Sequence, residues 1–225
     1  MKINLKNIAF TMAEMMMVMA IIGATAALTI PNLVDSYKEE QTIVKLKKVQ
    51  EDLNRAYKSA ILKYGEYDTW SSLTSAQKIS KLTEFLKGMP CEPTTCWPND
   101  LVTMVSGTKY ELEDGTTLSI RFLTGGYYQV LVAPFGAKSN ANFGQGIFGF
   151  FLDPIENASH TCTAGSNLTR SISTFYPQGY CEDRNISTNA FTGSGLSTSN
   201  WAVFNGNLDY LKCNDLNWET KTTCD

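Results

Sequence analysis

The first apolar segment of the chain is long enough to cross a membrane. Residues 10–30 form a run of 21 residues that carries one charge, the carboxylate of Glu14. At about 1.5 Å of rise per residue, a helix of this length covers roughly 30 Å, the thickness of the hydrocarbon core of a bilayer. Lys2 and Lys6 precede the run, and acidic residues follow it at positions 35, 39 and 40. By the positive-inside tendency, we expect the N-terminus in the cytoplasm and the rest of the chain outside it.

Beyond Pro31 the pattern changes to that of an amphipathic helix. Apolar residues recur mostly at steps of three and four, which places them on one face of a helix. This stripe consists of Val34, Tyr37, Val44, Val49, Leu53, Ala56 or Tyr57, Ala60 and Tyr64. Gly65 is a suitable stop signal. The sequence therefore predicts one helix over residues 10–64, with Pro31 as the expected place of a bend. Its polar half is expected to lay the stripe on a globular head.

The next part of the chain predicts a helix followed by strands. A second helix is expected from Ser75 to Lys87, with Thr74 as its N-terminal cap and Gly88 as its stop. Asp114-Gly115 then marks the turn of a hairpin. Four runs predict strands, namely residues 110–112, 117–122, 127–134 and 146–152. We therefore expect an antiparallel sheet packed against the long helix, an α+β fold.

The last third of the chain predicts loops more than regular structure. From Ser159 to Ser199 the residues are mainly Ser, Thr, Asn and Gly, with few apolar side chains. This stretch is either an exposed surface that meets partners or a tolerated insertion. Residues 201–213 are more apolar and predict a hairpin around Asn205-Gly206.

Six cysteines, all in the head, predict disulfide bonds. None has the C-x-x-C spacing of a zinc or redox site, and His160 is the one histidine of the chain. An even number of spread cysteines after an apolar segment is typical of a protein oxidised outside the cytoplasm. Six cysteines allow about fifteen pairings, which the sequence does not distinguish. We expect the sequential pairing: Cys91–Cys96, Cys162–Cys181 and Cys213–Cys224.

Three kinds of N-terminal segment fit the apolar run. It could be a signal peptide cleaved at Ala24-Thr25-Ala26, an uncleaved anchor, or the retained part of a chain cleaved on the cytoplasmic side. Glu14 favours the third, because a carboxylate costs about 2.5–3.5 kcal/mol at the membrane centre and is presumed functional. It could pair with the N-terminal amine of a neighbouring subunit, which cleavage before Phe10 would create. Within one chain, the carboxylate could interact with the Phe10 amine of its own helix or favour the positive N-terminus of that helix, and both roles can hold, before and after assembly.

These residues resemble the N-terminal signal of type IV pilins and type II secretion pseudopilins. The resemblance rests on Ala9-Phe10-Thr11-Met12-Ala13-Glu14, on the apolar run and on Pro31. In that family the prepilin peptidase cuts before the phenylalanine, and the new N-terminus is methylated. The acid at the fifth mature position matches Glu14, and many members have a proline where Pro31 stands. Ala9 departs from the commonest residue of the family, glycine, and Met12-Ala13 departs from the usual Leu-Ile or Leu-Ala.

The resemblance implies a division of the chain into a leader, an assembly helix and a head. The leader would be residues 1–9 and the helix residues 10–64, with a transmembrane segment at about 10–30. The extracytoplasmic head would be residues 65–225. The implied fold is pilin-like, with the long helix packed on an antiparallel sheet and with disulfide-bounded loops.

The implied function is that of a structural subunit, a pilin or pseudopilin, that polymerises through its apolar helix. Ala9 and Phe10 would form the processing site, and Phe10, Glu14 and Pro31 would serve assembly. Its partners would be the prepilin peptidase, an inner-membrane assembly platform, membrane lipid, and copies of itself and other pilin-like subunits. The chain would span the inner membrane once and then enter a cell-surface or periplasmic filament. Whether that filament belongs to a type IV pilus, a type II secretion system or a competence system stays open.

A second function class is a minor pilin or a membrane-tethered binding module. Its head loops, mainly residues 159–199, would then recognise a surface, DNA or an exported substrate. Abundance in the filament would separate this class from a major subunit.

The sequence predicts neither an enzyme nor a nucleic-acid-binding protein. It contains no G-x-S-x-G, no P-loop and no dinucleotide fingerprint. The net charge is -3, and loss of two leader lysines takes it to -5, so basic residues are not in excess. No cofactor is expected. A calcium site, which some pseudopilins have, would draw on Asp209, Asp215, Glu219 and Asp225, but their spacing is not that of a calcium loop.

Overall fold

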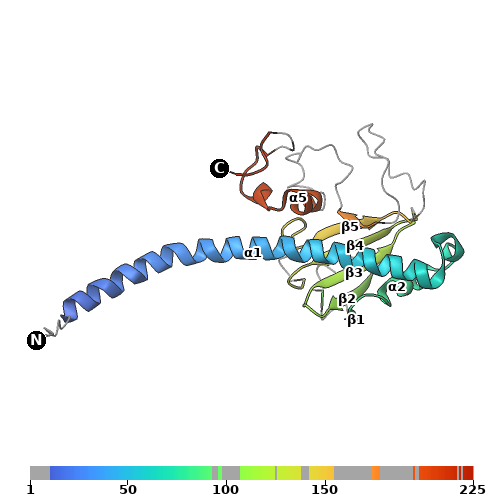
Figure 1. Ribbon diagram of the computed structural model, residues 1–225, viewed down its shortest axis with the longest axis horizontal. Coiled ribbons are helices and arrows are strands. Elements are labelled where there is room, and N and C mark those ends of the chain that lie inside the picture. The colour runs from blue at the N-terminus through green and yellow to red at the C-terminus, as the bar shows by residue number, and fades with distance from the viewer. Residues whose placement is uncertain are drawn as a thin grey trace, which may run out of the picture. The chain divides into compact units, whose positions relative to one another are not determined.

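The computed structural model divides into two compact units, residues 1–40 and 41–225. The first contains the apolar half of helix α1 (Met12–Tyr64), and the second contains the rest of α1 and the remaining elements (Figure 1). The structure describes residues 11–92, 96–97, 107–124, 126–137, 142–154, 174–177, 195, 198–216, 218 and 220–224.

The second unit is built around an antiparallel sheet that has six strands within these described ranges. Each strand pairs with its neighbours in sequence, in the order β1 to β6. The strands are β1 (Gly88–Pro90), β2 (Thr108–Leu112), β3 (Thr117–Phe122), β4 (Tyr128–Ala133), β5 (Phe148–Leu152) and β6 (Tyr176–Pro177). The two edge strands are short and contain proline, which cannot donate a ladder hydrogen bond. The predicted α+β architecture, with a long N-terminal helix and an antiparallel sheet, is confirmed.

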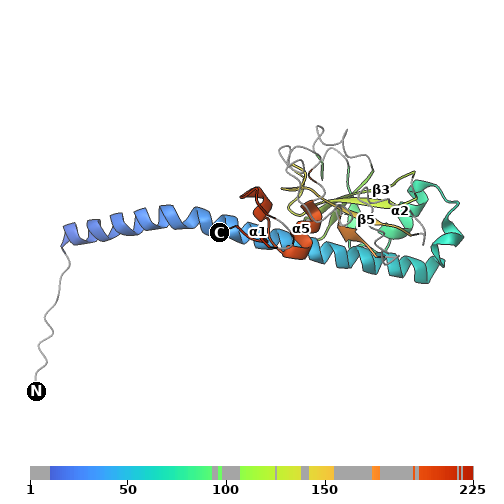
Figure 2. The same ribbon diagram turned by 90° about the horizontal axis from the view of Figure 1, so that it is seen from above.

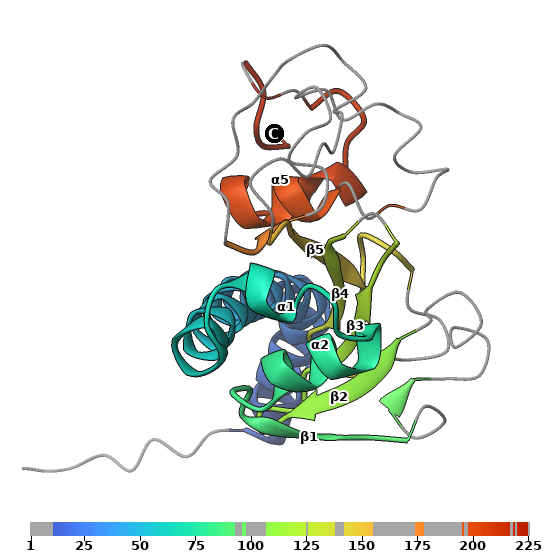
Figure 3. The ribbon, with the colours of Figure 1, turned by 90° about the vertical axis from the view of Figure 1, so that its right-hand side faces the viewer.

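Helices α1 and α2 (Ser75–Thr83) cover the same face of the sheet (Figures 2 and 3). The α1 side chains that enter this core are Ile43, Leu46, Val49, Leu53, Ala56, Tyr57 and Ala60. The facing sheet side chains include Leu118, Ile120, Val130, Val132, Phe148 and Phe150. From Val49 onward the predicted stripe is confirmed. Val34, Tyr37 and Val44 were predicted to be in the stripe but are exposed. Val44 is exposed because Ile43 and Leu46 face the sheet instead.

Polar side chains of α1 form hydrogen bonds at two separate places on the sheet. Lys45 donates hydrogen bonds to the backbone carbonyls of Pro134 (2.6 Å) and Asp114 (3.2 Å), near the β2–β3 turn. Toward the other edge, Gln50 donates to the carbonyl of Phe175 at 2.9 Å. Asn54 accepts from the backbone N–H of the same Phe175. The register of α1 on the sheet is thus set by hydrogen bonds as well as by the core.

The second helix begins as predicted but ends earlier. Thr74 caps it and exchanges hydrogen bonds with Gln77 in a capping box. The predicted end at Lys87 is wrong, because α2 ends at Thr83 and Gly88 belongs to β1. A Cβ on Gly88 would collide with the backbone of Glu111 in β2, so glycine permits this close pairing. Gly88 therefore serves strand pairing and is not the helix stop.

The opposite face of the sheet is partly covered by Trp97. Its ring is fully buried, and it belongs to a small cluster with Cys96, Leu131, Ala133 and Ile147. The cluster covers the part of this face that lies nearest the β2–β3 turn and the end of β4. It gives the sheet a second, smaller core beside the main one.

The C-terminal region docks onto β5 as a helix. α5 (Thr198–Asn205) buries Trp201, and the Ser199 hydroxyl accepts a hydrogen bond of 2.8 Å from the Gly149 N–H of β5. The predicted hairpin around Asn205-Gly206 is therefore wrong. Gly206, with φ +70°, follows the last helical residue, which is the usual place of a glycine in a helix-ending motif. The short 3₁₀ helix η3 (Asp209–Leu211) comes after it.

The pair Lys48–Asp114 yields a pH-dependent prediction. Its nitrogen and oxygen are 2.7 Å apart, and Thr116 also donates to the carboxylate. Burial alone would raise the pKa of Asp114, but the hydrogen bonds from Lys48 and Thr116 outweigh it and hold the pKa at about 2. The carboxylate therefore adds stability above its unfolded pKa of about 3.9, and this is lost as the pH falls toward 2.

We expect Asp114→Asn to lower the free energy of unfolding by about 1–2 kcal/mol near neutral pH, an estimate reduced because Lys48 is half exposed. The difference from the wild type should shrink as the pH falls through this window. Urea unfolding of the full chain in detergent micelles, followed by tryptophan fluorescence, measures it. Asp52→Asn is the control, since its pair with Arg55 spans 3.6 Å at the surface. If the difference in free energy of unfolding between the wild type and Asp114→Asn did not shrink in acid, the lowered pKa of Asp114 would be contradicted.

Candidate assembly site in the first helix

The first helix begins with a capping box between Thr11 and Glu14. The backbone N–H and the hydroxyl of Thr11 each donate to Oε2 of Glu14 at 2.8 Å. In return, the N–H of Glu14 donates to the Thr11 hydroxyl at 3.2 Å. This reciprocal arrangement satisfies backbone N–H groups that an α-helix leaves without partners at its start. Phe10 and Ala9, the predicted processing site, lie outside the described residues.

The capping box gives Glu14 a structural role within its own chain, which is to stabilise the start of α1. The observed bonds let Glu14 stabilise the start of α1 whether the segment is a signal peptide, an uncleaved anchor or a segment retained after cleavage. The cost of the carboxylate in the membrane therefore does not by itself favour the third alternative. The carboxylate still offers further acceptor positions, since an ionised acid has about four lone-pair sites and both bonds from Thr11 use one oxygen. Capping and pairing with a neighbour's amine are therefore compatible.

The apolar half of α1 is exposed in the first unit. Large side chains that are mainly exposed include Met12, Met16, Met17, Met19, Ile21, Ile22 and Leu28. By length and composition this segment is able to cross a membrane. Its two threonines suit that environment, because the hydroxyls bond within the helix: Thr25 donates to the carbonyls of Ile21 and Ile22, and Thr29 to that of Thr25, all at 3.0 Å. A hydroxyl bonded in this way presents no unsatisfied donor to lipid.

Pro31 lies inside α1, at the end of the apolar segment. The helix continues through it to Tyr64, where the sequence predicted its end. Proline has no N–H, so one carbonyl of the preceding turn loses its helical partner there. The role of Pro31 in assembly stays a prediction.

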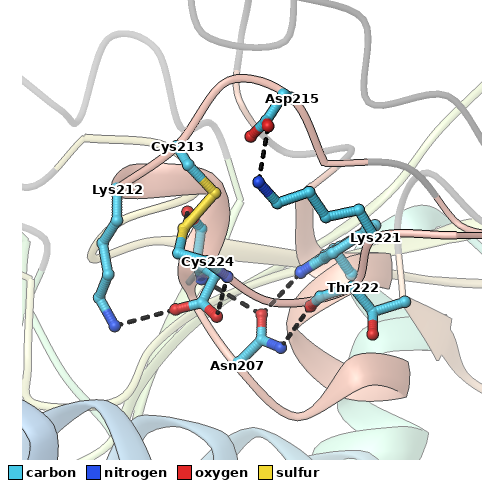
Figure 4. The surroundings of a disulfide bond; sticks show 9 residues. Asn207, Lys212, Cys213, Asp215, Lys221, Thr222 and Cys224 are labelled. Atoms are coloured by element: carbon cyan, nitrogen blue, oxygen red, sulfur yellow. Dashed lines mark hydrogen bonds and ion pairs between the residues drawn. A yellow bond between two sulfur atoms is a disulfide. The ribbon is translucent and has the colours of Figure 1, made fainter.

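Two of the three predicted disulfides are confirmed. Cys91 is bonded to Cys96 at the start of the segment that carries Trp97, and Cys213 is bonded to Cys224 near the C-terminus (Figure 4). Cys162 and Cys181 lie outside the described residues. Both confirmed bonds close short loops, over separations of 5 and 11 residues.

The C-terminal carboxylates proposed as calcium ligands are engaged by nitrogen donors. Asp209 accepts from Lys212 at 3.0 Å and from the N–H of Cys224 at 3.0 Å, and Asp215 accepts from Lys221 at 2.6 Å (Figure 4). No group of three His, Cys, Asp or Glu side chains gathers within the part of the chain that the structure describes. Glu219, Asp225 and His160 lie outside that part. The disulfide-bounded loop is thus organised around Asp209 by ammonium and amide groups.

A buried lysine–serine pair is a feature that the sequence analysis missed. Lys109 of β2 donates to the hydroxyl of Ser119, its cross-strand partner in β3, at 2.8 Å. Burial, followed by the nearby charge of Arg121, lowers the pKa of Lys109 to about 8. A serine beside a lysine of lowered pKa is a known nucleophilic arrangement. Here both side chains are almost fully buried, with exposures of 3% and 1%, so the pair serves as a cross-strand contact beneath Trp97.

Removing the Cys213–Cys224 bond should destabilise the second unit measurably. With a loop of 11 residues, the chain-entropy model gives about 3 kcal/mol. The bond also retains the segment whose Trp218 ring lies 4.8 Å from that of Trp201. We expect a Cys213→Ser/Cys224→Ser double variant to lose this amount in urea unfolding. Because the Cys91–Cys96 loop is shorter, we expect a Cys91→Ser/Cys96→Ser variant to lose less free energy of unfolding, about 2 kcal/mol. Unchanged stability in both double variants would refute the estimate.

Comparison with family models, with curated proteins and with solved structures finds no match to this chain.

Proposed function

We propose that the chain is a subunit of a type IV pilin-like filament. In this proposal the chain is cleaved before Phe10, held in the inner membrane by residues 10–30, and polymerised through that segment. The observation that supports it most is the exposed apolar half of α1, which carries a carboxylate at its start. Apolar surface alone suits an anchor. A charged group at its beginning suits a segment that leaves lipid and packs against other subunits.

Capping does not account for the charge of Glu14. A glutamine at the same position would complete the capping box without placing an ionisable group in the membrane. A carboxylate adds attraction to positive charge, both to the N-terminal end of its own helix and to a cation from a neighbouring subunit. Cleavage before Phe10 would supply that cation as a free N-terminal ammonium group on each subunit, and a bond between the two would favour packing in register.

The second unit is consistent with this proposal. Its half of α1 packs on an antiparallel sheet, with a disulfide at each of two loops, which is the architecture that the resemblance to pilins implies. Catalysis would belong to the partners: a prepilin peptidase that cleaves and methylates the chain, and an assembly platform that extracts it from the membrane. The head would remain outside the cytoplasm, where its disulfides are stable.

Mass spectrometry of the membrane-extracted protein tests the proposal. We expect a mature chain that begins at Phe10 and carries one N-terminal methyl group. An N-terminus after Ala26 would replace the proposal with a secreted head, and an intact Met1 would replace it with an uncleaved anchor. Electron microscopy of sheared surface material then tests for filaments that contain the mature chain.

A further inference from the structure

Helix α1 carries a second apolar stripe, between the membrane-spanning segment and the part of the helix that packs on the sheet. Leu33, Val34, Tyr37 and Val44 are each between 41% and 71% exposed, although all four have large apolar side chains. Steps of three, four and seven residues place them along one face of the helix, which is continuous here. Gln41 fills the turn between Tyr37 and Val44. We call these five residues the outer stripe.

The outer stripe does not belong to the core of the second unit. Ile43 and Leu46 of α1 are buried in that core, whereas Val44 between them is turned away from it. Among the residues that the structure describes, the side chains of Tyr37 and Gln41 have no hydrogen-bond or ring partner. The chain therefore presents an apolar helix face, with one amide in it, that its own fold does not bury.

We propose that the outer stripe binds the outer stripe of a second copy of this chain, with the two helices parallel. Two helices that each carry apolar side chains along one face bury them by packing those faces together. An anchor over residues 10–30 would hold all copies in one orientation and close to one another, which favours even a short contact. The contact lies outside the anchor and requires neither cleavage before Phe10 nor a filament, so it goes beyond the proposed function.

Gln41 favours a pair of identical helices in register. A polar side chain inside an apolar helix contact is costly unless it finds a hydrogen-bond partner there. A carboxamide both donates and accepts, so two Gln41 side chains that meet across the contact satisfy each other. They meet when the two copies pack symmetrically, as in helix pairs whose register is set by one polar residue in the seam. A partner with a wholly apolar face would leave the amide of Gln41 without such a bond.

The charges beside the outer stripe favour the parallel orientation. Glu40 lies along one edge of the stripe and Lys45, five residues later, lies along the other. In a parallel pair opposite edges meet, so Glu40 of one copy lies beside Lys45 of the other, whereas an antiparallel pair brings like edges together. Lys45 donates to the carbonyls of Asp114 and Pro134, which leaves its charge and one of its three N–H groups for such a contact.

A lipid surface is the rival occupant of the outer stripe. A helix that lies on a bilayer usually carries lysines and arginines on its polar face, which anionic headgroups attract. Residues 32–42 contain three acidic residues and one lysine, so such a surface would repel this segment. The opposite charges that a second copy offers at the two edges of the stripe suit the segment better.

Cysteine cross-linking of the full chain tests the proposal without any assembly partner. The variant Gln41→Cys is reconstituted at low density in phosphatidylcholine liposomes and oxidised with copper phenanthroline, with the wild type as the blank for the native cysteines. Two thiols that face each other across a helix pair can form a disulfide, so we expect a covalent dimer. The matched control is Ser36→Cys, because Ser36 is exposed in the same stretch but lies outside the stripe. Its dimer yield should be about tenfold lower.

A second substitution separates pairing from random collision. Tyr37→Asp, added to Gln41→Cys, places a charge in the stripe and should lower the dimer yield about tenfold, whereas Ser36→Asp should leave it unchanged. Both positions are exposed and precede the second unit, so neither change disturbs the core. Equal dimer yields from Gln41→Cys and Ser36→Cys, or no effect of Tyr37→Asp, would overturn the proposal. A thiol of Gln41→Cys that forms no dimer but is shielded from a water-soluble maleimide would assign the stripe to lipid instead.

Discussion

Replacing Glu14 with alanine should leave the chain in the membrane and reduce its recovery in sheared filaments more than tenfold. Insertion should be unimpaired, because the substitution removes a carboxylate that costs about 2.5–3.5 kcal/mol in hydrocarbon. Assembly should fail, because the N-terminal ammonium group of a neighbouring subunit would lose its partner among apolar helices. Quantitative immunoblots of the membrane fraction and of the sheared fraction measure the two effects separately.

Glutamine at position 14 is the matched control, because it separates capping from charge. Its side-chain oxygen can accept from Thr11 as the carboxylate does, so Glu14→Gln keeps the capping box and removes the charge. We expect Glu14→Gln to fail in assembly nearly as completely as Glu14→Ala. Thr11→Val, which loses the hydroxyl but keeps the charge, should assemble better than either. Normal filaments from Glu14→Gln would show that capping is the whole role of this residue and would remove the main support for the amine pair.

The parts of the fold that depend on local signals could be predicted from the sequence. The apolar stripe and the stop signal at Gly65 predicted the end of the long helix at Tyr64, and the cap at Thr74 predicted the start of α2. The β2–β3 hairpin followed from Asp114-Gly115 between two apolar runs. The two confirmed disulfides join cysteines that are close in sequence, which the sequential pairing favours.

Elements that depend on distant partners could not be predicted. β1 and β6 are three and two residues long and contain proline, a residue that argues against strands. Each forms because a longer strand offers it a free edge. The end of α2 before the predicted Lys87 also depends on a distant partner, because Gly88 pairs with Leu112 of β2 and is part of a strand.

The predicted hairpin around Asn205-Gly206 is wrong because this dipeptide occurs in two kinds of structure. Asn-Gly suits a hairpin turn, but a glycine also commonly follows the last residue of a helix. Burial of Trp201 against the core favours the helix, and its indole N–H donates to Asn207 just beyond Gly206. These contacts connect α5 with residues that the local pattern does not relate to it.

At the candidate assembly site, the sequence contains the signal of the observed cap. Thr11-x-x-Glu14 has the spacing of a capping box, and it precedes an apolar run as such motifs do. The cap was therefore predictable from the spacing of Thr11 and Glu14, independently of the charge of Glu14. The pair Lys109–Ser119, in contrast, could not be recognised from sequence, because sheet register brings the two residues together.

Gly144→Ala should destabilise the second unit by about 3 kcal/mol or more, because the added methyl group meets backbone that is already closely packed. The added Cβ would lie 2.5 Å from the carbonyl oxygen of Gly195 and closer still to the Thr198 hydroxyl. These atoms precede and begin α5, so relief of the clash would move α5 away from β5. That movement would break the bond between Ser199 and the N–H of Gly149.

Gly115→Ala is the control that isolates this clash from backbone strain. Both glycines have positive φ, +84° for Gly144 and +77° for Gly115, so both substitutions carry a strain of about 1–2 kcal/mol. A Cβ on Gly115 meets no atom within 4 Å. Urea unfolding of the full chain in micelles, followed by the fluorescence of the four tryptophans, compares the two variants. All four lie in the second unit, so the signal reports on the head. Equal losses would show that α5 does not pack tightly on this loop, whereas a loss confined largely to Gly144→Ala would show that close packing of two glycines holds the C-terminal region on the sheet.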